Sequence, residues 1–125
     1  MEQIRVLLAD DEEELVATLA ERLEIRGFIT EWVTTGEAAC EILREKTYDV
    51  AVLDVKMPGM NGPELKRRLA DIDPDLKFIF ITGHGSKDSF EECAAEAVSY
   101  YFLVKPVDID LLTGKIKEIM GGDEA

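Results

Sequence analysis

Apolar residues follow two spacings along the chain, and together these spacings predict five strands and five helices. Four short apolar runs, at 4–9, 50–53, 78–81 and 101–104, are typical of strands that are buried on both faces. A half-polar run at 28–33 indicates a strand nearer the edge of a sheet, where Trp32 is expected in the core or at its rim rather than as a platform for a ligand. The regular alternation of strands and helices predicts an α/β fold, with a parallel five-stranded sheet covered on both faces.

Capping residues and glycines set the predicted helix boundaries. The first helix follows Asp10-Asp11 and ends at Gly27, and the last ends at Gly121-Gly122. The other helix starts are predicted at Thr35-Gly36, Asn61, Ser86 or Ser89, and Asp108. The fourth helix would bury Phe90, Cys93, Ala94 and Ala97.

Composition narrows the class of protein. The 125 residues fit one domain, which we place at 1–122 with a short acidic tail at 123–125, and the sequence leaves open whether it was cut from a longer protein. The net charge of −13, from 27 acidic and 14 basic residues, argues against direct binding of nucleic acid or of anionic membranes. There is no apolar run of membrane-spanning length and no signal peptide, and Cys40 and Cys93 are expected to be buried free thiols. A cytoplasmic protein is therefore expected.

Polar residues stand directly after four of the predicted strands. Asp10-Asp11, Asp54, Thr82 and Lys105 should therefore converge at the carboxyl edge of the sheet, where open α/β sheets bind ligands. Three carboxylates at one edge repel one another, and a small hard cation such as Mg²⁺ would compensate them. Lys105 can bind an anion, Thr82 can donate a hydrogen bond to it, and Gly83 leaves room beside it. The set suits a phosphoryl group.

These residues occur in a pattern that resembles the receiver domain of bacterial two-component response regulators. The resemblance spans nearly the whole chain and rests on Asp10-Asp11, the Asp54-x-x-Met57-Pro58-Gly59-Met60-x-Gly62 run, Thr82-Gly83 and Lys105-Pro106. It implies a three-layer (βα)5, flavodoxin-like fold with strand order 2-1-3-4-5. It also implies a cis peptide bond at Lys105-Pro106.

The resemblance further implies a role for each residue at the metal and phosphoryl site. Asp54 would be the phosphoacceptor. Asp11, Asp54 and the backbone carbonyl of Lys56 would ligate Mg²⁺, and Asp10 would act on the metal indirectly. Lys105 would pair with Asp54 at rest and with a phosphate oxygen after phosphorylation.

A second group of residues would transmit the signal. Thr82 would move toward the phosphate and Phe102 would turn inward with it, which alters the surface of the fourth helix, fifth strand and fifth helix. The partners implied are a sensor histidine kinase or a histidine phosphotransfer protein, with an output domain or a homodimer formed through that surface. Two departures from the family pattern, Ala97-Val98 before the fifth strand and the missing hydroxyl of Phe102, bear on the switch rather than on the chemistry.

Other interpretations of the same residues remain open at this point. Asp11 and Glu14 fit a helix capping box, and Thr82 fits an ordinary strand end. The chain as a whole could be a phosphorylation-independent interaction module, or an aspartyl-phosphate phosphohydrolase, although the Asp-x-Asp motif of such enzymes is absent. We expect a signalling domain rather than an enzyme. We also hypothesise that Lys56 and His84, each two residues beyond a site residue, set the lifetime of the phosphoryl group.

Overall fold

The strands form one parallel sheet. The computed structural model describes residues 3–83 and 101–121. Its strands are β1 (Arg5–Ala9), β2 (Ile29–Val33), β3 (Val50–Asp54), β4 (Lys77–Thr82) and β5 (Tyr101–Val104). Every pair of neighbours is parallel, in the order β2-β1-β3-β4-β5, so the predicted topology is confirmed. The strand order reverses between β1 and β3, and the crevice at such a point is where doubly wound sheets bind ligands.

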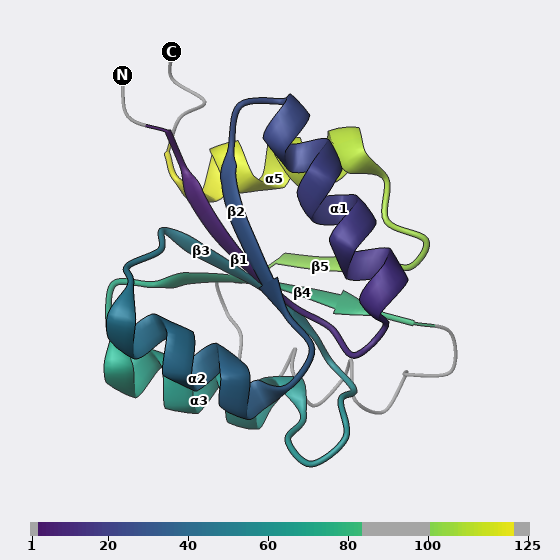
Figure 1. Ribbon diagram of the computed structural model, residues 1–125. Coiled ribbons are helices and arrows are strands. Elements are labelled where there is room, and N and C mark those ends of the chain that lie inside the picture. The colour runs from purple at the N-terminus through teal and green to yellow at the C-terminus, as the bar shows by residue number, and fades with distance from the viewer. Residues whose placement is uncertain (1–2, 84–100, 122–125) are drawn as a thin grey trace.

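Helices cover both faces of this sheet. The described helices are α1 (Glu13–Ile25), α2 (Gly36–Glu45), α3 (Gly62–Ile72) and α5 (Ile109–Ile119). In Figure 1, α1 and α5 lie on one face, and α2 and α3 lie on the other. Thr35, Asn61 and Asp108 cap their helices through side-chain oxygens, as predicted. The predicted fourth helix, with Cys93, lies outside the described residues.

The sheet divides the core into two layers. Leu7, Leu53 and Phe80 belong to the layer under α2 and α3, whereas the layer under α1 and α5 is built on other strand residues and closed by Leu112 and Ile116 of α5. Side chains alternate between the faces of a strand, so the central strands need an apolar residue at each position. This is why β1, β3 and β4 are nearly continuous apolar runs.

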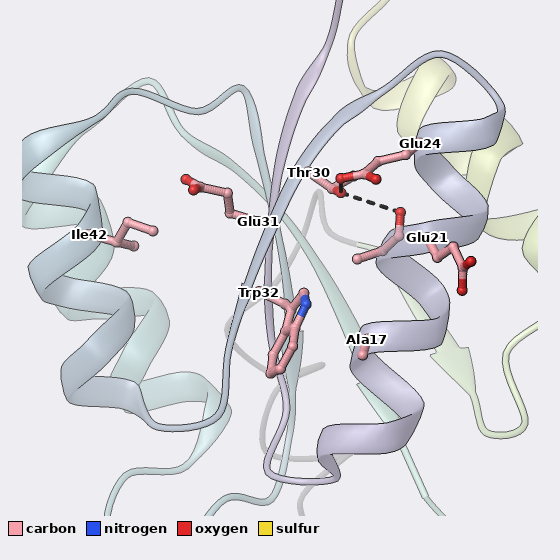
Figure 2. Close-up of a pocket in the computed structure, with 8 residues that line it drawn as sticks. Ala17, Glu21, Glu24, Thr30, Glu31, Trp32 and Ile42 are labelled. Atoms are coloured by element: carbon pink, nitrogen blue, oxygen red, sulfur yellow. Dashed lines mark hydrogen bonds between the residues drawn. The ribbon is translucent and has the colours of Figure 1, made fainter.

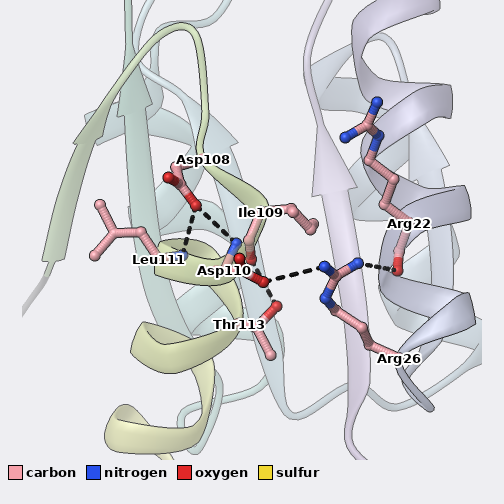
Figure 3. A network of polar contacts seen from close by, with 7 residues as sticks. All are labelled: Arg22, Arg26, Asp108, Ile109, Asp110, Leu111 and Thr113. Atoms are coloured by element: carbon pink, nitrogen blue, oxygen red, sulfur yellow. Dashed lines mark hydrogen bonds and ion pairs between the residues drawn. The ribbon is translucent and has the colours of Figure 1, made fainter.

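Polar contacts join α5 to α1 on their shared face (Figure 3). Asp108 Oδ1 accepts hydrogen bonds from the backbone N–H groups of Asp110 (2.9 Å) and Leu111 (3.1 Å), which fixes the start of α5. Arg26, just after α1, pairs with Asp110 at 3.0 Å. The pair is solvent-exposed, so it contributes little to stability and mainly marks where the two helices meet.

Local details differ slightly from the predicted boundaries. The second strand begins at Ile29 rather than Phe28, because the backbone N–H of Phe28 donates to the Leu23 carbonyl and closes the end of α1. The Lys105-Pro106 bond is cis and Cys40 is a buried free thiol, both as expected. Within residues 3–83 and 101–121, no helix has the length and apolar character needed to cross a bilayer.

Candidate functional site

Three carboxylates meet at the carboxyl ends of β1 and β3. Asp10 follows β1, Asp54 is the last residue of β3, and each of Asp10, Asp11 and Asp54 offers an oxygen within 4.8 Å of the others. Asp10 is fully buried and Asp54 is 4% exposed, whereas Asp11 is open to solvent. The predicted convergence of these residues is confirmed. A cluster with two buried members and one exposed member can hold a cation that keeps part of its water shell.

The two oxygens of Asp10 have different surroundings. Oδ1 accepts a hydrogen bond of 2.9 Å from the backbone N–H of Glu12. Oδ2 is buried and has no hydrogen-bond partner among the described residues, although the charged Nζ of Lys105 lies 3.1 Å away. Burial raises the pKa of Asp10. A buried carboxylate oxygen that forms no hydrogen bond and faces a positive charge is typical of a cation-binding site.

Asp54 is held in an environment that opposes its charge. Burial, and then the neighbouring charge of Asp10, raise the pKa of Asp54 to about 7, against a smaller opposing effect of Lys105 and of the Lys56 backbone N–H. A metal cation beside the carboxylate would favour the ionised form, which is the nucleophilic one. The donor set of Asp10, Asp11 and Asp54, all carboxylate oxygens, therefore fits Mg²⁺.

Lys105 reaches this cluster from the end of β5. Its backbone N–H donates to the Thr82 carbonyl at 2.8 Å, which ties the ends of β4 and β5 together. Its ammonium lies 2.5 Å from Glu12 Oε1, 3.1 Å from Asp10 Oδ2 and 3.7 Å from Asp54 Oδ1. Burial would lower the pKa of Lys105, but the hydrogen bond to Glu12 and the ion pairs with Asp10 and Asp54 together outweigh it and raise the pKa. Lys105 thus stays charged.

Glu12 is a site residue that the sequence analysis missed. The expected pairing of Lys105 with Asp54 is present at 3.7 Å, but Glu12 is its nearest carboxylate. The sequence analysis gave Glu12 no role at the site. In the structure it is the N-cap residue of α1 and makes no side-chain capping bond, so its carboxylate is available to Lys105. The alternative capping box of Asp11 and Glu14 is therefore wrong.

Thr82 is the last residue of β4, which lies next to β3, and Gly83 follows it. Asp54 is in register with Ile81, so Thr82 lies one residue beyond Asp54 on the neighbouring strand. Thr82 is 4% exposed, and its hydroxyl donates to the Gly83 carbonyl at 3.2 Å. A Cβ on Gly83 would lie 3.8 Å from Lys105 Cδ, which is an ordinary contact.

Phe102 lies on the neighbouring strand β5, in register with Phe80. The two rings stack, with centroids 5.4 Å apart and planes 17° from parallel. Phe102 is half-buried and packs against the layer under α2 and α3. The ring of Phe102 therefore packs directly on the core beneath the site, through its contact with Phe80.

The turn between β3 and α3 comes very close to Asp54. The Gly62 N–H donates to the Val55 carbonyl at 2.8 Å. A Cβ at Gly62 would lie only 2.9 Å from Val55 Cα and 3.1 Å from the Asp54 carbonyl oxygen. Gly59 has φ +84°, a conformation that favours glycine. The sequence motif contained both glycines, but only the structure gives the reason for Gly62.

The family model of the response regulator receiver domain matches residues 6–117. This chain belongs to that family. Receiver domains are signalling phosphoacceptor domains of two-component systems.

Several relatives of this receiver are informative. It is 35% identical over 117 residues to the sensor kinase CckA of Brucella abortus, covering 92% of the receiver but only 12% of that kinase. It is 29% identical to sporulation initiation phosphotransferase F of Bacillus subtilis, covering 93% of each chain. A receiver domain structure from Clostridium thermocellum superposes with a TM-score of 0.85 at 27% identity, covering 97% of both chains. Similar chains thus occur both inside long proteins and as short ones.

Of the two residues expected to set the lifetime of the phosphoryl group, Lys56 and His84, the structure describes only Lys56. Lys56 is exposed beside the site, and its backbone N–H is hydrogen-bonded to Asp54. His84 lies outside the described residues. Their roles stay predictions.

Proposed function

We propose that this receiver accepts a phosphoryl group on Asp54 from the phosphohistidine of a sensor kinase or a histidine phosphotransfer protein. The observation that carries the proposal is the buried Asp54 carboxylate, with two further aspartates and the Lys105 ammonium around it. Neither an isolated turn residue nor a strand end needs such surroundings. Relatives within sensor kinases and among phosphotransferases support the same chemistry.

In the proposed reaction, an oxygen of Asp54 forms a bond to phosphorus. The bond from phosphorus to the imidazole nitrogen of the donor breaks, and that nitrogen keeps the electron pair. Lys105, 3.7 Å from Asp54, would shift to a phosphate oxygen and neutralise its charge. Thr82 would donate its hydroxyl to another phosphate oxygen.

Mg²⁺ would supply charge neutralisation between the aspartates and the phosphoryl oxygens. Asp11, Asp54 and the backbone carbonyl of Lys56 would hold it, with Asp10 acting indirectly. The buried and unsatisfied Asp10 Oδ2 supports this assignment. The role of the protein is therefore to position the phosphoryl group and to neutralise its negative charge.

Phosphorylation would act as a signal rather than as one step of a turnover cycle. Thr82 and Phe102 would respond to the new charge and alter the surface formed by the fourth helix, β5 and α5. The altered surface would change a contact with another protein, with an output domain or with a second copy, in the cytoplasm. We take 1–122 as the receiver and 123–125 as its acidic tail.

Intact mass spectrometry after incubation with acetyl phosphate, with and without Mg²⁺, tests the proposal. We expect a Mg²⁺-dependent gain of one phosphoryl group, which Asp54→Asn abolishes. Asp75→Asn is the matched control, because it removes the same charge from an exposed position outside the site. A gain of mass in Asp54→Asn would overturn the assignment. No gain in wild type, together with no binding of beryllofluoride, would favour the phosphorylation-independent module, and sustained turnover of a phosphate ester would favour the phosphohydrolase.

The lifetime hypothesis for Lys56 and His84 has a separate test. We propose that Lys56, exposed beside Asp54, restricts the approach of water to the acyl phosphate and prolongs its life. Lys56→Ala and His84→Ala should then change the rate of dephosphorylation without changing the site of phosphorylation. Unchanged dephosphorylation rates in both variants would refute this hypothesis.

A further inference from the structure

β2 is an edge strand of the sheet, and a groove runs along its outer side (Figure 2). It has a volume of about 400 Å³ and is lined by four residues of α1, by Thr30, Glu31 and Trp32 of β2, and by Ile42 of α2. Helices therefore flank the open edge of the strand on both sides. Within the described residues, no strand pairs with this side of β2.

The backbone of β2 presents unpaired hydrogen-bonding groups to this groove. On the side of β1, the Ile29 N–H donates to the carbonyl of Ile4, just before β1, and the Val33 carbonyl accepts from the N–H of Asp10, just after it. Alternate residues of a strand direct their backbone groups to the same side. Thr30 and Trp32 therefore direct theirs outward, and each has one donor and one acceptor. Such an edge can accept an added strand.

The side chains around this edge favour a cation. Trp32 is 37% exposed and shares a strand face with Thr30. Figure 2 shows the carboxylates of Glu24 and Glu31 on the two sides of β2. The hydroxyl of Thr30 lies 2.8 Å from Glu24 Oε2 and fixes that carboxylate at the rim of the groove. An indole face and fixed carboxylates together suit the guanidinium of an arginine.

The acidic residues of the groove differ in how far they are already neutralised. Glu31 is hydrogen-bonded to Tyr48 and paired with Lys46 at 2.9 Å, which lowers the pKa of Glu31. Glu21 and Glu24 form no ion pair with a described residue. The unneutralised charge is therefore on the α1 side, the side to which Thr30 and Trp32 point.

We propose that this groove binds an extended basic segment of a partner protein, which adds to β2 as a strand and places arginine or lysine beside Trp32. Side chains of an added strand alternate between its two faces, so basic residues at every second position would all meet the α1 side. A second copy of this chain is a poor occupant, because its net charge is −13 and its groove would bring glutamates against glutamates. The groove is separated from Asp54 by β1, so this docking does not depend on the phosphoacceptor.

Trp32 is the only tryptophan of the chain, so its fluorescence reports on the groove directly. The probe is a short acetylated peptide that alternates arginine with threonine, titrated into the full chain at low salt. Two control peptides have the same length: one replaces arginine with glutamate, and one keeps arginine but carries N-methyl groups on alternate amides. We expect saturable changes in emission with the first peptide alone, because the methylated peptide cannot form the strand hydrogen bonds.

Charge variants test whether the glutamates recognise the peptide. Glu21→Gln/Glu24→Gln should weaken binding about five-fold at low salt. Glu41→Gln/Glu45→Gln removes the same charge from exposed positions of α2 that do not line the groove, and should leave binding nearly unchanged. Amide chemical shifts measured with the same peptide should change most at Thr30 and Trp32.

Three results would overturn the proposal. The first is an absence of saturable binding by the arginine peptide. The second is equal binding of the N-methylated peptide, or equal loss in both double variants, since either outcome would indicate a general attraction to an acidic protein. The third is concentration-dependent self-association that changes Trp32 emission without peptide, which would assign the groove to a second copy.

Discussion

The closest backbone approach at the candidate site is at Gly62, and we predict that a single methyl group there destabilises the protein. In Gly62→Ala the new Cβ would lie 2.9 Å from Val55 Cα, 3.1 Å from the Asp54 carbonyl oxygen and 3.2 Å from Phe80 Cε1. Two of these neighbours are backbone atoms at the end of β3 and the start of the following turn, and they cannot rotate away. Insertion of a methyl group into a closely packed region costs about 1–3 kcal/mol.

The matched control is Gly114→Ala, in the exposed middle of α5. A Cβ there would meet nothing within 4 Å. Alanine is a better helix former than glycine, so this variant should gain about 0.5–1 kcal/mol of stability. The same chemical change is thus expected to have opposite signs at the two positions.

Thermal and urea unfolding measure both effects. At about 2.1 cal/mol/K per residue, the entropy of unfolding makes 1 kcal/mol equivalent to a shift of roughly 4 °C for a chain of this length. Gly62→Ala should therefore lower the melting temperature by about 4–12 °C, and Gly114→Ala should raise it by about 2–4 °C. If Gly62→Ala were as stable as wild type, the close packing of α3 against the end of β3 would be refuted.

Three further predictions concern the site and its supports. The pKa of Asp54 is about 7 in the folded protein, against an ordinary value of 3.8, so the folded state binds more protons between these two values. In Mg²⁺-free buffer, stability should therefore fall as pH rises through this window, by up to about 4 kcal/mol. A flat profile in wild type, or an equally steep one in Asp54→Asn, would contradict this prediction. Glu12→Gln should free Lys105 and tighten beryllofluoride binding a few-fold, measured by calorimetry, whereas Glu13→Gln, an exposed neighbour, should not. Asn61→Ala removes the side-chain cap of α3 and should cost about 1 kcal/mol in urea unfolding; no loss would mean that the cap is dispensable.

The sequence predicts most of this fold because the strands are buried on both faces. A strand such as β3 must be apolar at every position up to Asp54, and that continuity is visible without a structure. Parallel strands place their carboxyl ends at the same edge of the sheet. This direction alone predicts that the residues at the strand ends converge there, namely Asp10, Asp11, Asp54, Thr82 and Lys105. The strand order itself came from the family resemblance, because periodicity does not encode which strands are neighbours.

Contacts that depend on side-chain direction could not be predicted in the same way. Glu12 stands next to two site residues, but no pattern says whether a residue at a helix start points to solvent or back to Lys105. Trp32 was expected in the core or at its rim, and its partial exposure depends on how α1 and α2 flank the edge strand. The packing of Gly62 against Val55 likewise depends on the path of the turn in three dimensions.

The two-layered core has a consequence for the growing chain during synthesis. Among the residues that the structure describes, the buried members of the layer under α2 and α3 all lie between Leu7 and Phe80, so this part of the core is available once α3 and β4 have emerged from the ribosome. The opposite layer lacks Leu112 and Ile116 until α5 has been made. One face of the nascent sheet therefore stays partly uncovered until translation reaches the last helix, and that face is where a chaperone would first find apolar surface.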